Sequence, residues 1–339
     1  MITIESFEGL PLKYESFLIK KYGSYITTCR YIEIYYPAYQ INYMLVYEES
    51  KLIELLIFGN SGNFSKCFNS LVEIDQNIIT ECTRKLFELY PSIQKIKIDA
   101  SYVNYEFEKS VLHSTSDDYI LNLPATIEDY NSELGPKTRK HLRQRIERLK
   151  REFEEVNFVV KYGVEIDESI IDKIIQFNHD RMTVKGKKSG INQTYKNYRY
   201  RYSQYYGCVA YLELNGEIVA GCITTILNNH IFLHVVAHNN NFSKYNVGEV
   251  CVYNLLQASI EKQISLAHFL WGASELKNRL LAKSHLIFSY YIYRNYSMDF
   301  CLNRVDVKFR DILNELKHSK VAVPFRNAIK SLRTTKLKV

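Results

Sequence analysis

The chain has 339 residues, of which 46% are hydrophobic and 24% charged, and its formal net charge is +7. This length and composition predict a globular protein with two full-sized domains. The N-terminus lacks the basic, apolar and small-residue pattern of a signal peptide, and no apolar run approaches the roughly 18 residues needed to cross a bilayer. We therefore expect a cytoplasmic protein without a transmembrane segment.

The cysteines are odd in number and show no Cys-x-x-Cys spacing. This pattern favours reduced thiols in the core over disulfides or a zinc site. His179 and Asp180 are adjacent at a helix end, but no third ligand is spaced to join them, so we expect no metal. The seven cysteines are Cys29, Cys67, Cys82, Cys208, Cys222, Cys251 and Cys301.

The first third of the chain reads as strands around one clear helix. Asp75 is a good N-cap for a helix over residues 75–90, where apolar residues recur at helical spacing, and Pro91 ends it. A short amphipathic helix is expected over residues 11–21. The expected strands cover residues 31–36, 42–47, 52–58, 64–72, 93–98 and 118–123.

The remaining two thirds begin with two predicted helices, over residues 137–151 and 167–182. Three strands in a meander follow, because Asn215-Gly216 is a strong hairpin signal and Asn228-Asn229 marks a second turn. A loop, a helix over residues 249–263 and a second buried strand come next. The predicted strands cover residues 208–214, 217–227, 231–237, 264–271 and 284–293.

This order of strands, loop, helix and strand resembles the core of the GNAT acyltransferase superfamily. Tyr245-Asn-Val-Gly248 resembles the Tyr-Ser-Pro-Gly signature of the CelD-type (BioF-like acetyltransferase) subfamily, whose relatives are the FemABX aminoacyltransferases. In that superfamily, the pantetheine of acyl-coenzyme A lies between the two strands that flank the helix, and the pyrophosphate lies on the loop. The first free N–H groups of a helix favour an anion there.

The first half repeats the order of the second half, although not its residues. Together with the resemblance, this implies a mixed α/β fold with tandem GNAT units, each a mostly antiparallel sheet flanked by helices. The N-terminal copy is expected to be degenerate and structural, because no glycine precedes its helix. The expected limits are 1–123 for that copy, 124–155 for a basic connecting helix, 156–302 for the catalytic copy and 303–339 for a basic tail.

The resemblance implies acetyl-CoA or another acyl-CoA as co-substrate, held by the loop. Backbone N–H groups of Val236 or Ala237 would polarise the thioester carbonyl. Lys244 suits a phosphate, whereas Glu249 in the first helical turn does not, and an ordinary connection is the alternative. The remaining residues expected to bind the cofactor are Ser243, Tyr245, Asn246, Val247 and Gly248.

The basic helix contains a second resemblance, to the Leu-Pro…Tyr…Lys-x-Arg…Arg-Arg segment of CelD-type enzymes. Arg139, Arg143 and Lys150 lie on one shoulder of its apolar stripe, where they could bind a phosphate or carboxylate. A solvated basic helix is the alternative. His179, at the end of the next helix, and Arg181, in the basic loop after it, are the other expected acceptor-binding residues, with a plain surface loop as the alternative.

The candidate catalytic residues follow from the chemistry that the resemblance implies. Acyl transfer to an amine needs a base, an acid and an oxyanion donor. His234 on the central strand is the candidate base, although a buried structural histidine is the alternative. Lys277 matches the family's Gly-Asp-x-x-Tyr-Lys motif, from which Ala273 and Leu276 depart. Tyr290, Tyr291 and Tyr293 are candidate acids that the sequence does not separate, and Tyr291 is the working candidate.

The sequence thus predicts an acyl-CoA-dependent N-acyltransferase. Its acceptor would be an amine, such as a nucleotide-linked amino sugar or a cell-envelope precursor of polysaccharide biosynthesis. One alternative is a FemABX-like transferase that uses aminoacyl-tRNA, which the net charge of +7 would attract. Another is a non-catalytic scaffold with the same fold. Otherwise we expect no nucleic-acid partner, and the basic C-terminal tail offers a peripheral membrane contact as an alternative to simple solvation.

Overall fold

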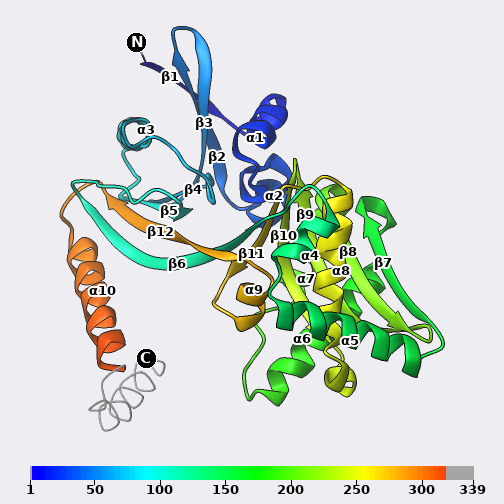
Figure 1. The fold of residues 1–339 in the computed structure, drawn as a ribbon. Coiled ribbons are helices and arrows are strands. Elements are labelled where there is room, and N and C mark those ends of the chain that lie inside the picture. The colour runs from blue at the N-terminus through cyan, green and yellow to red at the C-terminus, as the bar shows by residue number, and fades with distance from the viewer. Residues whose placement is uncertain (1, 318–339) are drawn as a thin grey trace.

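The computed structural model describes residues 2–317, whose strands form one continuous sheet of twelve members flanked by helices (Figure 1). The strand order is β1-β2-β3-β4-β5-β12-β6-β11-β10-β9-β8-β7. The predicted mixed, mostly antiparallel fold with two similar halves is confirmed. The domain limits predicted from the sequence stay a prediction.

The N-terminal half supplies the first strands and three helices. Its elements are β1 (Ile2–Glu8), α1 (Glu15–Tyr22), α2 (Cys29–Tyr35), β2 (Gln40–Glu48), β3 (Lys51–Ser61), β4 (Phe64–Cys67), α3 (Gln76–Leu89), β5 (Lys95–Ser101) and β6 (Ser110–Asn122), with short 3-10 helices at Leu12–Tyr14 and Tyr25–Thr27.

The C-terminal half follows two connecting helices. Its elements are α4 (Ile127–Glu133), α5 (Pro136–Glu152), β7 (Val156–Tyr162), α6 (Glu168–Val184), α7 (Gln193–Tyr206), β8 (Gly207–Leu214), β9 (Glu217–Leu227), β10 (His230–His238), α8 (Val247–Glu261), β11 (Leu266–Trp271), α9 (Glu275–Arg279), β12 (Lys283–Tyr293) and α10 (Met298–Lys317), with 3-10 helices at Gly163–Glu165 and Asn240–Tyr245.

The repeat is visible in the pairing of the strands. Among the described strands, only β4 with β5 and β10 with β11 run parallel, and each pair flanks one helix, α3 or α8. The two halves also exchange strands, because β12 lies between β5 and β6 while the end of β6 pairs with β11. This exchange joins the two sheets into one surface.

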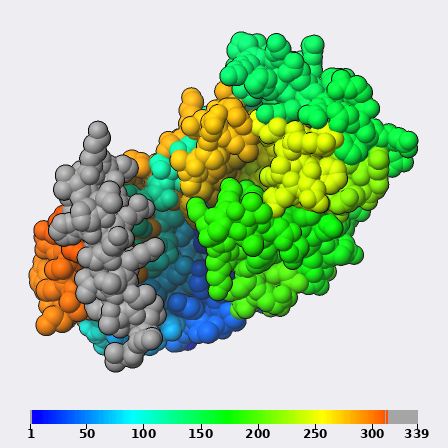
Figure 2. Space-filling view, turned by 90° about the horizontal axis from the view of Figure 1, so that it is seen from below, coloured from blue at the N-terminus to red at the C-terminus, as the bar shows by residue number. Residues whose placement is uncertain are grey.

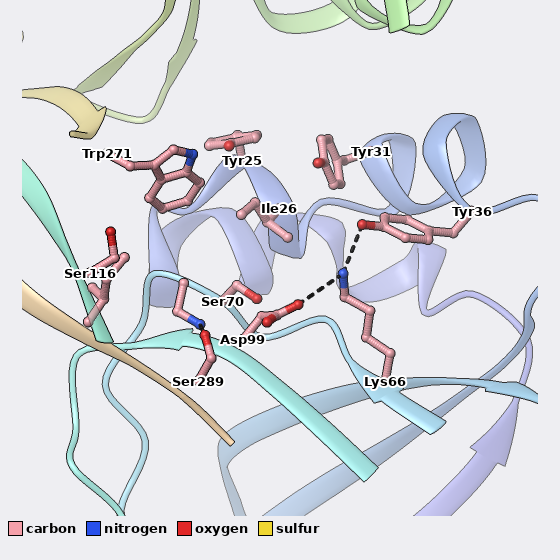
Figure 3. Close-up of a pocket in the computed structure, with 12 residues that line it drawn as sticks. Tyr25, Ile26, Tyr31, Tyr36, Lys66, Ser70, Asp99, Ser116, Trp271 and Ser289 are labelled. Atoms are coloured by element: carbon pink, nitrogen blue, oxygen red, sulfur yellow. Dashed lines mark hydrogen bonds and ion pairs between the residues drawn. The ribbon is translucent and has the colours of Figure 1, made fainter. Parts of the chain in front are cut away.

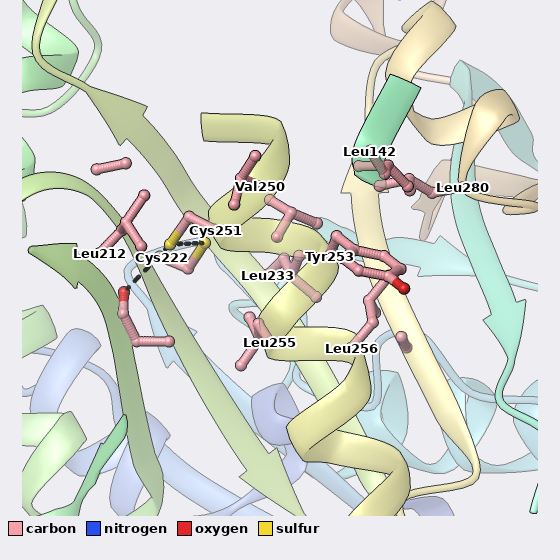
Figure 4. Close-up of a cluster of buried hydrophobic side chains, with 14 of the residues drawn as sticks. Leu142, Leu212, Cys222, Leu233, Val250, Cys251, Tyr253, Leu255, Leu256 and Leu280 are labelled. Atoms are coloured by element: carbon pink, nitrogen blue, oxygen red, sulfur yellow. Dashed lines mark hydrogen bonds between the residues drawn. The ribbon is translucent and has the colours of Figure 1, made fainter. Parts of the chain in front are cut away.

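Helix α8 is the centre of the C-terminal core (Figure 4). It is apolar on most of its circumference, so it is buried between the sheet and the layer formed by α4 and α5. Leu142 and Leu149 of α5 pack into this core, and the Sγ atoms of Cys222 and Cys251 lie 3.8 Å apart inside it. Helices α6 and α7 cover the opposite face of the sheet, where Ile174 packs against Val209 and Ile223.

Some sequence predictions were wrong in kind. Residues 31–36 were expected to be a strand, but Cys29–Tyr35 is a helix whose N-cap, Thr28, accepts a hydrogen bond from the N–H of Tyr31. Tyr31 and Tyr35, one helical turn apart, stack on each other at 4.3 Å and pack on α7. These contacts stabilise the helix, because a strand would not place the two rings together. Strand β1 and helix α7 were not predicted, and the basic tail from Arg326 onwards lies outside the described residues.

No helix in residues 2–317 combines the length and the apolar character needed to cross a membrane. Within the same residues all cysteines are free thiols, and six of the seven are buried, as the spacing predicted.

Candidate functional site

Strands β10 and β11 separate at the centre of the C-terminal half. They pair only at His230 with Leu266, Ile231 with Ala267, and Phe232 with His268. Beyond Phe232, β10 continues to pair with β9 up to His238, while β11 remains on β6. The edge of β10 that faces away from β9 therefore presents peptide groups without a strand partner among the described residues beyond Phe232. The resemblance implies a gap between these strands for the pantetheine, and the structure has such a separation, which begins after Phe232.

A β-bulge at the start of this separation directs His234 to the side of the sheet that α7 covers. Leu233 pairs with Thr224 and Val235 with Ile223, so His234 is the extra residue. Its Nε2 lies 2.9 Å from Oγ1 of Thr225, and the ring of Tyr25 meets it edge-on at 4.7 Å. Burial, and then the charge of Arg199, hold the pKa of His234 well below its ordinary value. The imidazole is therefore neutral at physiological pH, as a base must be.

The loop after β10 leads into an uncapped helix. Asn246 has a φ of +55° and its side chain makes no cap hydrogen bond, so the N–H groups of Val247 and Gly248 have no partner among the described residues. Ser243 and Lys244 are exposed beside them. Tyr245 is buried and donates to Oε2 of Glu152 at 2.7 Å, which ties the loop to α5. The predicted loop residues thus divide into a tether and an uncapped helix start, at which Val247 and Gly248 are buried.

Cationic side chains of α6 approach the same helix start. A Cβ on Gly248 would lie 3.0 Å from Nδ1 of His238, so the glycine permits this imidazole to lie against the helix. Burial is the main cause of the lowered pKa of His238, and the positive charges of Arg181 and Lys185 lower it further. Both cations therefore lie near this imidazole. The buried Nε of Arg181 has no hydrogen-bond partner among the described residues. Arg181, expected in an acceptor pocket, therefore lies near the loop predicted for the cofactor.

Glu249 provides an internal anion in the first turn of α8. Its carboxylate lies 2.6 Å from Nη1 of Arg145 on α5 and 2.8 Å from Nη2 of Arg279 on α9. Its side chain is 8% exposed. Three elements are therefore joined at the point where a helix dipole favours negative charge.

A cavity of about 320 Å³ lies between the two halves, next to the end of β11. Figure 3 shows Trp271, Tyr25 and Tyr31 on one side of it, facing Lys66, Asp99 and Ser289. From below, the molecular surface is hollowed between the green segment of α6 and α7 and the strands of the N-terminal half (Figure 2). The full lining is Tyr25, Ile26, Tyr31, Tyr36, Lys66, Ser70, Asp99, Ala100, Ser116, Trp271, Ile287 and Ser289.

The cavity has an aromatic end and a charged end. Trp271, at the end of β11, is 48% exposed. At the other end, Nζ of Lys66 lies 2.8 Å from the Tyr36 hydroxyl and 3.4 Å from Asp99. Strands β5, β12 and β6 lie between β4, which carries Lys66, and β11, which carries Trp271. Four spacings of about 4.8 Å therefore put the two strands on the order of 19 Å apart. The sequence did not single out Trp271 or Lys66, because neither lies in a motif.

Lys277 lies behind this end of β11. Its Nζ donates to the carbonyl oxygens of Leu270 and Trp271, both at 2.9 Å, and lies 5.0 Å from the centre of the Tyr119 ring. Burial lowers its pKa. In this arrangement the ammonium holds the turn that positions Trp271.

A buried polar cluster lies where the strands begin to separate. Nδ1 of His268 is 2.8 Å from Oδ2 of Asp118, which also accepts from the Tyr102 hydroxyl at 2.7 Å. Nε2 of His268 is 3.4 Å from Nδ1 of His230, and its ring stacks on Phe232 at 4.4 Å. Asp118 is fully buried. Sequence reasoning did not identify Asp118, which comes from the other half of the chain.

The structure keeps several predicted residues apart from this centre. Tyr291 lies on the part of β12 that pairs with β5, with His113 at 4.7 Å and Nζ of Lys95 at 5.0 Å from its ring. Arg139 and Arg143 are exposed on α5 and line a separate groove of about 670 Å³. The His179 carbonyl accepts from Thr183 within α6, and the side chain is only partly buried. Lys150 is exposed on the last turn of α5.

Residues 136–278 match the family model of the acetyltransferase (GNAT) domain. This segment of 143 residues is similar to that domain. It contains the separated strands, the uncapped helix and the bulge, and it makes the protein an acyltransferase enzyme that transfers an acyl group to an amine. No group of three or more potential metal ligands occurs in the described part of the chain.

Solved structures share the fold over most of the chain. A crystal structure of FemX aligns with a TM-score of 0.62 at 9% identity, covering 86% of this chain and 98% of that one. The C-terminal domain of a putative lysylphosphatidylglycerol synthetase from Agrobacterium fabrum gives 0.53 at 10% identity, covering 86% and 93%. The L-PGS structure from Bacillus licheniformis gives 0.52 at 15%, covering 88% and 96%. A comparison with curated protein sequences finds no match.

These similarities extend the Fem-like fold to the N-terminal half, outside the matched GNAT domain. That half differs at the equivalent position. Strand β4 pairs with β5 along its whole length, and Asp75 accepts from the N–H groups of Asn77 and Ile78 at the start of α3. It therefore has neither separated strands nor an open helix start.

Proposed function

We propose that the GNAT domain transfers an acyl group, with acetyl the simplest case, from acyl-CoA to a primary amine. The observation that carries this proposal is the separation of β10 from β11 after Phe232, with the bulge at His234 beside it. The pantetheine arm would lie along the unpaired edge of β10. Its phosphates would lie at Val247 and Gly248, near Arg181 and Lys244.

The reaction assigns roles to this chain's groups. The amine nitrogen attacks the thioester carbonyl, forms the C–N bond and displaces the thiolate. A backbone N–H of Val236 or Ala237 would stabilise the oxyanion, as preorganised donors do. Neutral His234 would accept the amine proton, directly or through water. Lys277 would act indirectly, by holding the turn that positions Trp271. The acid that protonates the leaving thiolate would be a group nearer to the separated strands than Tyr291 is.

The interhalf cavity is the proposed acceptor site. It lies beside the separated strands, since Trp271 ends β11 and Tyr25 contacts both the cavity and His234. Its aromatic rings suit the face of a sugar, and its serines and Asp99 suit hydroxyl groups. An amino sugar or a cell-envelope precursor therefore fits as the acceptor class, with the N-terminal half supplying most of the contacts.

A thermal-shift titration of the full chain with acetyl-CoA tests the donor. A ligand that binds only the folded state raises the melting temperature, by an amount equivalent to about 2.7 kcal/mol at 100 times its Kd. We expect a shift with acetyl-CoA and the release of CoA thiol when amines are added. The His234→Ala variant should keep the shift and lose the turnover. Absence of a shift with every acyl-CoA tested would refute the proposal.

A second candidate, transfer from aminoacyl-tRNA, is favoured by two observations. Glu249 places a carboxylate where a pyrophosphate would lie, and α5 presents a groove lined by Arg139, Lys140 and Arg143, which suits an RNA backbone. Binding of tRNA that weakens steeply with salt, lost in Arg139→Gln with Arg143→Gln, would support this alternative. Acetyl-CoA binding without tRNA binding would exclude it.

A further inference from the structure

Arg199 on α7 is a buried cation without a counter-ion in the part of the chain that the structure describes. Arg199 is 4% exposed, and no carboxylate of the described side chains lies within 4 Å of its guanidinium. Nη2 donates to the Tyr195 hydroxyl at 3.0 Å, while Nε and Nη1 have no hydrogen-bond partner within residues 2–317. Burying a positive charge in this way destabilises the fold unless an anion pairs with it and accepts its hydrogen bonds.

Apart from the Tyr195 hydroxyl, the described surroundings of Arg199 supply aromatic rings rather than hydrogen-bond acceptors. The guanidinium lies over the rings of Tyr195 at 5.2 Å and Tyr35 at 5.7 Å, and these contacts stabilise a cation without satisfying its N–H groups. The buried Tyr35 hydroxyl has no partner either. Arg199 thus has an unpaired N–H on each of its two bidentate edges, Nε/Nη2 and Nη1/Nη2, among the described residues, and a carboxylate on either edge could accept from it.

This cluster lies next to the proposed reaction centre. The charge of Arg199 acts on both His234 and Tyr25, which contact each other at 4.7 Å. Tyr31 lines the interhalf cavity and stacks on Tyr35 at 4.3 Å, so this aromatic pair lies between the cavity and the guanidinium. A rotation of these rings would open the path.

We propose that Arg199 and Tyr35 bind a carboxylate carried by the acceptor close to its amine. A guanidinium binds a carboxylate through two parallel hydrogen bonds. One buried positive charge is balanced by one carboxylate, whereas a phosphate dianion would leave a net charge buried. The inference rests on the proposed function and narrows it, because it requires the acceptor to be an amino acid or an amino sugar acid.

The first test needs no substrate. Replacing a buried unpaired cation with an apolar side chain of similar length is often stabilising, so Arg199→Met should melt no lower than the wild type. Sodium acetate at 50 mM, against sodium chloride at equal ionic strength, should raise the melting temperature by about 2 °C for a site of roughly 10 mM affinity. This shift should occur in the wild type and in the matched control Arg201→Met, an exposed arginine on the same helix, and not in Arg199→Met. An equal response in all three proteins would overturn the inference.

The second test uses matched acceptors with acetyl-CoA. Alanine is compared with alaninamide, and 2-amino-2-deoxyglucuronic acid with glucosamine, by release of CoA thiol. The acid of at least one pair should have a kcat/KM roughly 10- to 100-fold higher, the value of charged hydrogen bonds, and Arg199→Gln should remove this preference. Faster turnover of the neutral members would refute the carboxylate site while leaving acyl transfer intact. If the wild type did not bind acetyl-CoA at all, the proposed function itself would be refuted.

Discussion

Replacing Glu249 with glutamine should weaken the fold and strengthen donor binding at the same time. The carboxylate is 8% exposed and lies between Arg145 and Arg279, whose side chains are 20% and 38% exposed. Removing one member of a fully buried pair costs about 3–5 kcal/mol. Because Arg279 is more than a third exposed, solvent screens part of this loss, and we expect roughly 1–3 kcal/mol. The melting temperature should then fall by about 1–4 °C.

The opposite effect on the donor follows from Coulomb's law. A carboxylate about 8 Å from a phosphate, at an effective dielectric constant of about 20, repels it by roughly 2 kcal/mol. Glu249→Gln also frees two arginines for the phosphates. We therefore expect acetyl-CoA to bind the variant roughly 30-fold more tightly, measured by calorimetry at constant ionic strength.

The matched control is Glu275→Gln, which removes the exposed partner of the same Arg279. This variant should change neither the melting temperature nor the affinity by a measurable amount, because exposed ion pairs contribute little. If Glu249→Gln lost stability but bound acetyl-CoA equally or more weakly, the phosphates would not lie at the start of α8, and that part of the reasoning would be wrong.

Three further predictions concern acidity, packing and the acceptor. Burial and the neighbouring His268 lower the pKa of His230 to about 4; the unfolded chain takes up this proton near pH 6.5, so stability should fall between pH 6.5 and 4 by at most about 3 kcal/mol, and His230→Gln should flatten that slope in urea unfolding. Gly221→Ala should destabilise by about 1–3 kcal/mol in the same assay, because its Cβ would lie 2.5 Å from the side chain of Ile174. Trp271→Ala should raise KM for the amine several-fold and leave acetyl-CoA binding unchanged, in initial-rate kinetics and calorimetry; a change in donor affinity alone would contradict the acceptor assignment.

The elements with strong local signals were predictable from the sequence. Asp75 as an N-cap, the Asn215-Gly216 turn and the long apolar pattern of α8 act over a few residues, and the structure has each where expected. Helix α2 was misread because its alternation of aromatic and aliphatic residues suits a strand as well. Its helical form depends on the contact of Tyr35 with α7, about 160 positions away, which no local pattern reports.

The candidate site was predictable only for residues that are close together in the sequence. The separated strands, the loop and His234 lie in one continuous segment, so motif reasoning reached them. The exchange of strands between the halves brings Asp118 and Lys66 to the site, and the packing of α7 on α2 brings Arg199. These contacts join distant parts of the chain, so the spacing of residues in the sequence does not predict them. Arg181 illustrates the opposite case, since it was named for the acceptor and lies beside the helix start instead.

The two halves show why one topology gives a site only once. Each half places a helix between two parallel strands, so each could in principle offer a helix N-terminus at a gap in the sheet. In the N-terminal half, Asp75 satisfies the first N–H groups of α3, and full pairing of β4 with β5 leaves no gap. In the C-terminal half, Asn246 leaves α8 uncapped, and the bulge at His234 changes the direction of β10 as it leaves β11. A carboxylate cap and one extra residue in a strand therefore distinguish the half without a gap from the half in which we propose the donor site.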